Sequence, residues 1–301
     1  MAKADSLKSI FYALAANFSI AVAKLIAAII TNSGSMMAES IHSFADCSNQ
    51  GLLLLGLKRA KHPPDSKHPL GYGKTIYFWS FIVAIMLFSM GGLFSIYEGT
   101  HKLHDSEGLS SPLIAIGVLI FAIVAEGLSL AGCIREVNKV RGTRSLWRWF
   151  RETRQSELMV IFGEDIAALF GLVFALLAVG LTMLTGNPVF DAMGSIMIGI
   201  LLLVIAVMIG SEVKDLIIGQ GVEPARQKAM QDYLDKQASI DTVFNLITLQ
   251  MGNDVMVAIK AKMAPQPSDT ALIEAINEVE SGFRSEFPDV VWCFFEPDLH
   301  D

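Results

Sequence analysis

Six apolar stretches dominate the sequence and constrain what it can fold into. Each is near the ~20 residues that a helix needs to cross the hydrocarbon layer of a membrane. Over the whole chain 52% of residues are hydrophobic and 18% are charged, which is typical of integral membrane proteins. We therefore predict six membrane-spanning helices, over residues 9–30, 35–57, 75–97, 112–134, 157–184 and 189–211.

Basic residues are concentrated in alternate connections between these stretches. The connections after the second and fourth stretches carry five and seven Lys or Arg residues, whereas Lys102 is the only such residue in the other three. By the positive-inside rule, the basic connections and both termini face the cytoplasm. Because no targeting peptide is recognisable, we expect a plasma (inner) membrane of bacterial type, with an organelle membrane as the alternative.

The last 89 residues differ from the rest, with seven basic and fifteen acidic side chains. Residues 255–263 alternate as in a half-buried strand, and Leu272, Ile276, Val279 and Phe283 share one helix face. We predict two domains, a six-helix membrane domain over 1–212 and a cytoplasmic α+β domain over 213–301 with the order helix, strand, strand, helix, strand. The tail is too acidic for a nucleic-acid partner.

A polar stripe interrupts the second apolar stretch. At about 100° per residue, Glu39, His42 and Asp46 fall on one face, and His42 and Asp46 are one turn apart. Ionisable side chains inside a bilayer are costly unless paired or ligated, which makes them candidates for function. The alternative is a packing hydrogen bond between helices.

The donor types indicate which ion such a pair would bind. Imidazole nitrogen with carboxylate oxygen suits zinc, manganese, iron or cobalt better than copper(I), magnesium or calcium. A second helix must contribute, and Glu164 and Asp165 in the fifth stretch are candidates, of which one is expected to face the ion. For Glu126 and Asp191, structural pairing and ion contact both remain open, whereas we expect Asn17 to be a packing contact.

The chemistry of His42 and Asp46 indicates what could drive transport. Metal ligands must lose protons to bind, and histidine titrates near neutral pH, so metal and protons compete for one site. Exchange of the two across the bilayer would be antiport. An enzyme is not expected, because HExxH, GxSxG and P-loop motifs are absent from the sequence. A transport-inactive scaffold or regulator is the alternative.

The chain resembles the cation diffusion facilitator family of divalent-metal exporters. His42 and Asp46 match the family's HxxxD, and HPLGYGKTIYFWS at 68–80 is similar to its usual entry into the third span. The resemblance covers nearly the whole chain. It implies a ferredoxin-like αββαβ tail, a homodimer in the lipid bilayer, and exchange of zinc, iron, cobalt or manganese for protons by alternating access.

The sequence departs from the family pattern in the fifth stretch. The family usually has His or Asp there, followed four residues later by Asp, and no such pair exists here. If Asp165 takes the second position, Ile161 takes the first; if Glu164 takes the first, Ala168 takes the second. We favour Asp165, with Glu164 as the alternative and Glu39 or Glu126 completing the metal site.

Further departures lie outside the membrane. Some members bind metal through Asp-x-x-His and a further histidine in the loop after the second span; Asp65 and His68 match, but Tyr72 stands in the last position. Positions where some members have tail histidines hold Phe244 or Asn245 and Lys260. We therefore expect a tail that dimerises more than it senses metal, and a solvated terminus at three ionisable residues, Glu296, Asp298 and His300.

Overall fold

The structure is a computed structural model that describes residues 2–104 and 111–300, with side chains from residue 17 onward. Residues 105–110 of the connection between the third and fourth apolar stretches lie outside this description, as does Asp301. The chain folds into two compact units. The first comprises residues 1–56, 79–146 and 157–212, and the second comprises 57–78, 147–156 and 213–301. Two connections between membrane helices thus belong to the same unit as the tail.

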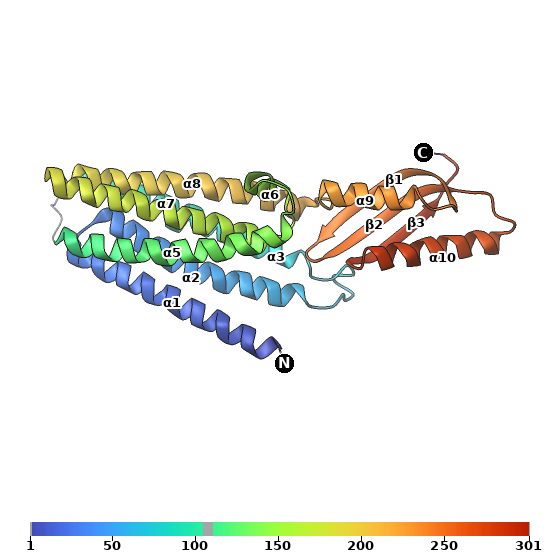
Figure 1. Ribbon diagram of the computed structural model, residues 1–301, viewed down its shortest axis with the longest axis horizontal. Coiled ribbons are helices and arrows are strands. Elements are labelled where there is room, and N and C mark those ends of the chain that lie inside the picture. The colour runs from blue at the N-terminus through green and yellow to red at the C-terminus, as the bar shows by residue number, and fades with distance from the viewer. Residues whose placement is uncertain (1, 105–110, 301) are drawn as a thin grey trace. The chain divides into compact units, whose positions relative to one another are not determined.

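Long helices build the first unit (Figure 1). They are α1 (Ala2–Thr31), α2 (Gly34–Ala60), α3 (Thr75–Met86), η1 (Leu87–Leu93), α4 (Phe94–His104), α5 (Pro112–Val140), α7 (Ser156–Thr185) and α8 (Val189–Ile218). Within the described residues, four helices are long and apolar enough to cross a membrane: Thr75–His104, Pro112–Val140, Ser156–Thr185 and Val189–Ile218. This confirms a helical membrane domain. The six-span count stays a prediction, because polar residues lower the hydropathy of α2 and only Asn17–Thr31 of α1 is described as an apolar helix.

The segments α3, η1 and α4 follow one another as one continuous helix over Thr75–His104, the third long helix in chain order. Glycines let this third long helix approach α8 closely. A Cβ atom added to Gly99 would lie 2.7 Å from the carbonyl oxygen of Ala192, and one added to Gly199 would lie 2.7 Å from the carbonyl oxygen of Gly92. Lipid tails give apolar helices little reason to associate, so membrane helices depend on such close packing of small residues. The two helices therefore contact each other through their backbones.

The third long helix is not α-helical throughout. Residues Leu87–Leu93 form the π-helical segment η1, between α3 and α4. Just beyond it, the hydroxyl of Ser95 donates to the carbonyl oxygen of Gly91 at 2.6 Å. A π-helical segment is rare and widens the helix locally, and the Ser95 bond supplies this carbonyl with a side-chain partner.

The second unit contains a three-stranded sheet with helices. Its elements are α6 (Leu146–Glu152), α9 (Pro224–Leu234), β1 (Ile240–Met251), β2 (Asp254–Met263), α10 (Asp269–Glu286) and β3 (Val290–Pro297). The strand order is β1-β2-β3, with β1 and β2 antiparallel and β2 and β3 parallel. Alternate residues of β2 are buried with Val279 and Phe283 of α10. A small C-terminal α+β domain with the predicted order of elements is thus present.

The turn between β1 and β2 lies against the chain that enters α3. A Cβ atom on Gly73 would lie 1.8 Å from the carbonyl oxygen of Met251, and Gly252 has a φ of +74°. The backbone N–H of Gly252 also donates to the Tyr77 hydroxyl at 3.0 Å. Glycine is required at both positions, one for close approach and one for a left-handed backbone.

Candidate functional site

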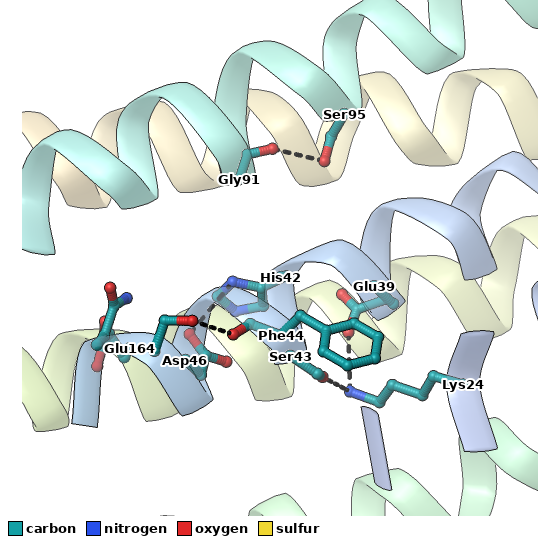
Figure 2. Close-up of polar contacts among 11 residues, drawn as sticks. Lys24, Glu39, His42, Ser43, Phe44, Asp46, Gly91, Ser95 and Glu164 are labelled. Atoms are coloured by element: carbon teal, nitrogen blue, oxygen red, sulfur yellow. Dashed lines mark hydrogen bonds and ion pairs between the residues drawn. The ribbon is translucent and has the colours of Figure 1, made fainter. Parts of the chain in front are cut away.

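The His42–Asp46 pair lies on the buried face of α2. Its side chains are one turn apart and face each other (Figure 2). The distance between His42 Nδ1 and Asp46 Oδ1 is 3.5 Å, and the side chains are 0% and 16% exposed. Within the described part of the chain, both ring nitrogens of His42 and Oδ1 of Asp46 lack a hydrogen-bond partner. Buried polar atoms are nearly always satisfied in proteins, so these three atoms are available to a ligand.

The two acids of α7 stand in different environments. Glu164 is buried, and its Oε1 accepts a hydrogen bond from Asn49 Nδ2 at 2.5 Å. Asp165 is partly exposed, and both its oxygens lie 3.4 Å from the Ser129 hydroxyl of α5. Neither carboxylate is held by a cation in these contacts, and either retains oxygen atoms that could bind an ion.

Asp46, Glu164 and Asp165 share a small cavity of about 20 Å³. That is room for about one water molecule or ion. Its lining is mostly polar: Asn17, Ser43, Asp46, Gln50, Glu126, Ser129, Ile161, Glu164, Asp165 and Ala168. The structure thus brings together Asp46 of α2, the two acids of α7 and the further candidate Glu126 of α5, and Asn17 of α1 also lines this cavity.

The donors surround this cavity without closing on one point. In the described residues, no three of the His, Cys, Asp and Glu side chains converge closely enough to hold a metal ion together. His42 is not among the residues that line the cavity. A bound ion would therefore require His42 and the α7 acids to approach each other.

Glu39 has a partner that the sequence analysis missed. Its Oε2 lies 3.4 Å from Nζ of Lys24 on α1, and Nζ also donates to Ser43 Oγ at 2.7 Å. All but Ser43 are fully buried, and Ser43 nearly so. The available signal was a lone lysine within the first apolar stretch. Glu39, predicted as a metal ligand, is thus held against a cation.

Asp191 caps the start of α2. Its carboxylate accepts hydrogen bonds from the Ser33 hydroxyl at 2.7 Å, the Gly34 N–H at 2.6 Å and the Ser35 hydroxyl at 2.5 Å. Negative charge at a helix N-terminus is favourable, and the free N–H groups need acceptors. Of the two readings left open for Asp191, the contacts therefore favour structural pairing.

A second His–Asp pair lies in the loop before α3. Asp65 Oδ1 accepts the backbone N–H groups of Lys67 and His68 at 2.9 and 2.7 Å, and Tyr72 donates its hydroxyl to Oδ2 at 2.7 Å. The Tyr72 hydrogen bond, with the His68 and Lys67 amides, lowers the pKa of Asp65. Tyr72 thus uses one of the oxygens that a loop metal site would need.

The tail positions expected to lack metal ligands pair across the sheet. Asn245 on β1 faces Lys260 on β2 in the antiparallel register. Nζ of Lys260 in turn lies 3.1 Å from Asp298 Oδ2, and this contact is the main cause that lowers the pKa of Asp298. One carboxylate of the terminal group Glu296, Asp298 and His300 is therefore occupied by a lysine.

Buried ionisable side chains whose polar atoms lack hydrogen-bond partners among the described residues, set in a bundle of apolar helices, are typical of membrane proteins that move ions. The family model for the cation efflux transmembrane domain matches residues 10–218. The chain belongs to the cation diffusion facilitator family of metal transporters.

Curated relatives support this assignment. The chain is 31% identical over 231 residues to the mitochondrial proton-coupled zinc antiporter SLC30A9 of Homo sapiens, covering 76% of this chain and 41% of the relative. It is 29% identical over 246 residues to metal tolerance protein C4 of Arabidopsis thaliana, covering 80% and 53%. The magnetosome protein MamB of Magnetospira is 26% identical over 195 residues, covering 64% and 60%. The chain thus spans about two-fifths to three-fifths of these relatives.

Proposed function

We propose that this protein is a proton-coupled antiporter that exports a divalent metal cation by alternating access. The observation that carries the proposal is the His42–Asp46 pair, buried in the helical unit with three polar atoms that lack a partner among the described residues. Asp165 or Glu164 on α7 supplies the second half of the metal site. The printed name of the human relative, a proton-coupled zinc antiporter, supports both the cargo and the coupling.

Zinc is the leading cargo, with iron, manganese and cobalt as the other candidates. Zinc accepts imidazole nitrogen and carboxylate oxygen in a four-coordinate site. His42, Asp46 and one α7 acid provide three such ligands, and water or Glu126 provides the fourth. Before binding, the ligands lose their protons, so a proton gradient that reprotonates them drives release of the metal.

The remaining expectations complete the proposal. The membrane part has six spans with both termini in the cytoplasm, and the tail has a ferredoxin-like fold and joins two copies in a homodimer. The topology of the sheet and the predicted order of its helices and strands support the fold of the tail. The membrane in which the protein works is left open between a plasma membrane and an organelle membrane; the human relative is named as mitochondrial.

The test is zinc uptake into proteoliposomes that contain the full chain, with and without a pH gradient. Wild-type protein should take up zinc in proportion to the gradient, whereas His42→Ala and Asp46→Ala should lose uptake. His68→Ala, in the exposed loop pair, is the matched control and should keep it. Equal uptake by all variants would refute the site. No uptake of zinc, iron, manganese or cobalt by wild type would favour the transport-inactive scaffold.

A further inference from the structure

Lys24 is a buried cation close to the proposed metal site. It lies on α1 and is fully buried. A lone ammonium group in such a place is costly, and residues of this kind are retained where they are paired or functional. Its position therefore needs a physical reason beyond the packing of α1.

Two residues of α2 hold the Lys24 ammonium. Its Nζ lies 3.4 Å from Glu39 Oε2 and 2.7 Å from Ser43 Oγ. Figure 2 draws both contacts as dashed lines. The other oxygen of Glu39, Oε1, has no hydrogen-bond partner in the part of the chain that the structure describes. It lies over Gly171 of α7, where an added Cβ atom would be 2.2 Å away. Lys24 thus pairs with Oε2 of Glu39, whereas Oε1 has no hydrogen-bond partner among the described residues.

The same contacts connect Lys24 to the metal donors. Ser43, which accepts from Lys24, lines the cavity together with Asp46, and it follows His42 directly in the chain. Asn17, two turns before Lys24 on α1, also lines this cavity. The cation therefore contributes to the field in which a metal binds.

We propose that Lys24 is a specificity-determining positioning residue that keeps the Glu39 carboxylate out of the metal's ligand set. This rests on the proposed metal transport. With Lys24 present, Glu39 is held in an ion pair and the imidazole of His42 remains among the donors, and imidazole nitrogen suits zinc. Without it, Glu39 becomes an additional oxygen ligand one turn from His42. Cations that prefer oxygen, such as Mn²⁺, gain most from an added carboxylate.

The experiment compares Mn²⁺ and Zn²⁺ uptake into proteoliposomes at one pH gradient. Lys24→Gln keeps a hydrogen-bond donor for Ser43 but removes the charge, and it should raise the Mn²⁺/Zn²⁺ uptake ratio by about tenfold, as expected when ligand charge changes. Lys24→Met, which also removes the charge, should raise this ratio to a similar extent. Lys24→Arg keeps a cation and should retain the wild-type ratio. Addition of Glu39→Gln to Lys24→Gln should abolish the gain.

A purely structural ion pair gives a different pattern. It would lower uptake of both metals by the same factor in every Lys24 variant, and this unchanged ratio would overturn the proposal. The neutral double variant guards against loss of folding, because replacing both members of a buried ion pair is better tolerated than removing one. Glu39→Gln alone leaves the ammonium uncompensated and should weaken binding of both ions.

Failure of the transport proposal is distinguishable from failure of this one. Calorimetric titration of the detergent-solubilised full chain with Zn²⁺ and Mn²⁺ measures selectivity without any transport. If wild type transports neither ion but Lys24→Gln shifts the ratio of binding constants towards Mn²⁺, the role of Lys24 stands and the antiport does not. If wild type transports zinc and Lys24→Gln leaves the ratio of the binding constants unchanged, the antiport stands and the role of Lys24 does not.

Discussion

Two His–Asp pairs of nearly equal separation lie in different parts of the molecule. His42 and Asp46 on α2 are 3.5 Å apart, whereas Asp65 and His68 in the loop before α3 are 3.6 Å apart. The first pair is 0% and 16% exposed, and the second is 51% and 47% exposed for His68 and Asp65. Geometry of the pair alone therefore does not distinguish the two sites.

The difference lies in what surrounds each aspartate. Asp65 receives hydrogen bonds from two backbone amides and from Tyr72, and water reaches the rest of its surface. Asp46 Oδ1 and both nitrogens of His42 have no hydrogen-bond partner among the described residues and little access to water. A buried polar group without a partner costs free energy, and a bound ion removes that cost. Burial, more than the motif, therefore separates the pair that we propose as the metal site from the loop pair.

The strongest test neutralises one aspartate of each pair. Asp46→Asn should weaken zinc binding by at least about 100-fold, because even groups that only support a metal ligand are worth 10–100-fold. Asp65→Asn, the matched control, should change the dissociation constant by less than about twofold. Titration calorimetry of the solubilised chain measures both. Equal losses would show that burial does not separate the pairs.

Asp191 tests whether every buried carboxylate of the helical unit contributes to zinc binding. It is buried like Glu164 but is fully engaged in capping α2. Asp191→Ala should lower stability by about 1.5–3 kcal/mol, the range for hydrogen bonds to a charged group, and leave zinc affinity nearly unchanged. A thermal melt with parallel calorimetry checks this, with exposed Asp215→Ala as control. A loss of affinity larger than the loss of stability would make Asp191 a metal ligand.

Gly73 tests how the loop pair is held in place. The residue lies between Tyr72 and α3, against the β1–β2 turn. Gly73→Ala forces a Cβ atom into the carbonyl of Met251 and should destabilise the second unit by about 1–3 kcal/mol, as overpacking does. Gly117→Ala on α5, where nothing lies within 4 Å of the added atom, is the control. Thermal melts measure both, and equal stability of the two variants would contradict the close approach.

The smallest effect concerns the Tyr72–Asp65 hydrogen bond. Because the pKa of Asp65 is lowered in the folded protein, its stabilisation is present above the unfolded value of about 3.9 and is lost as the pH falls through the folded value. Tyr72→Phe should therefore lower the melting temperature slightly at pH 6, and the difference should vanish below about pH 3. The double variant with Asp65→Asn should show no further loss. A difference that grew towards low pH would contradict this.

Local patterns allowed correct prediction of much of the fold. Apolar stretches of membrane length predict helices, and four of them are confirmed as long and apolar enough to span. Alternation over 255–263 predicts β2, and the i, i+4 spacing of His42 and Asp46 predicts that they lie together. In each case the information lies within one element, where helix or strand geometry alone fixes which side chains are neighbours.

Contacts between elements that are distant in the sequence could not be predicted from it. Lys24 and Glu39 are on different helices, so their ion pair depends on how α1 packs against α2. Asp191 reaches Gly34 across 157 positions of sequence. The Asn49–Glu164 hydrogen bond likewise joins α2 to α7. Periodicity gives the face of a helix but not its neighbour, so the pairing of Glu39 with Lys24 could not be predicted from the sequence.

The π-helical segment Leu87–Leu93 changes how insertions and deletions act on the third long helix. Each π-helical bond spans one residue more than an α-helical bond, so the segment accommodates an extra residue between α3 and α4. Deletion of one residue within 87–93 could close the helix as regular α and keep Gly99 facing α8. The same deletion after Phe94 would rotate Gly99 by about 100° and place a larger neighbour against the backbone of α8.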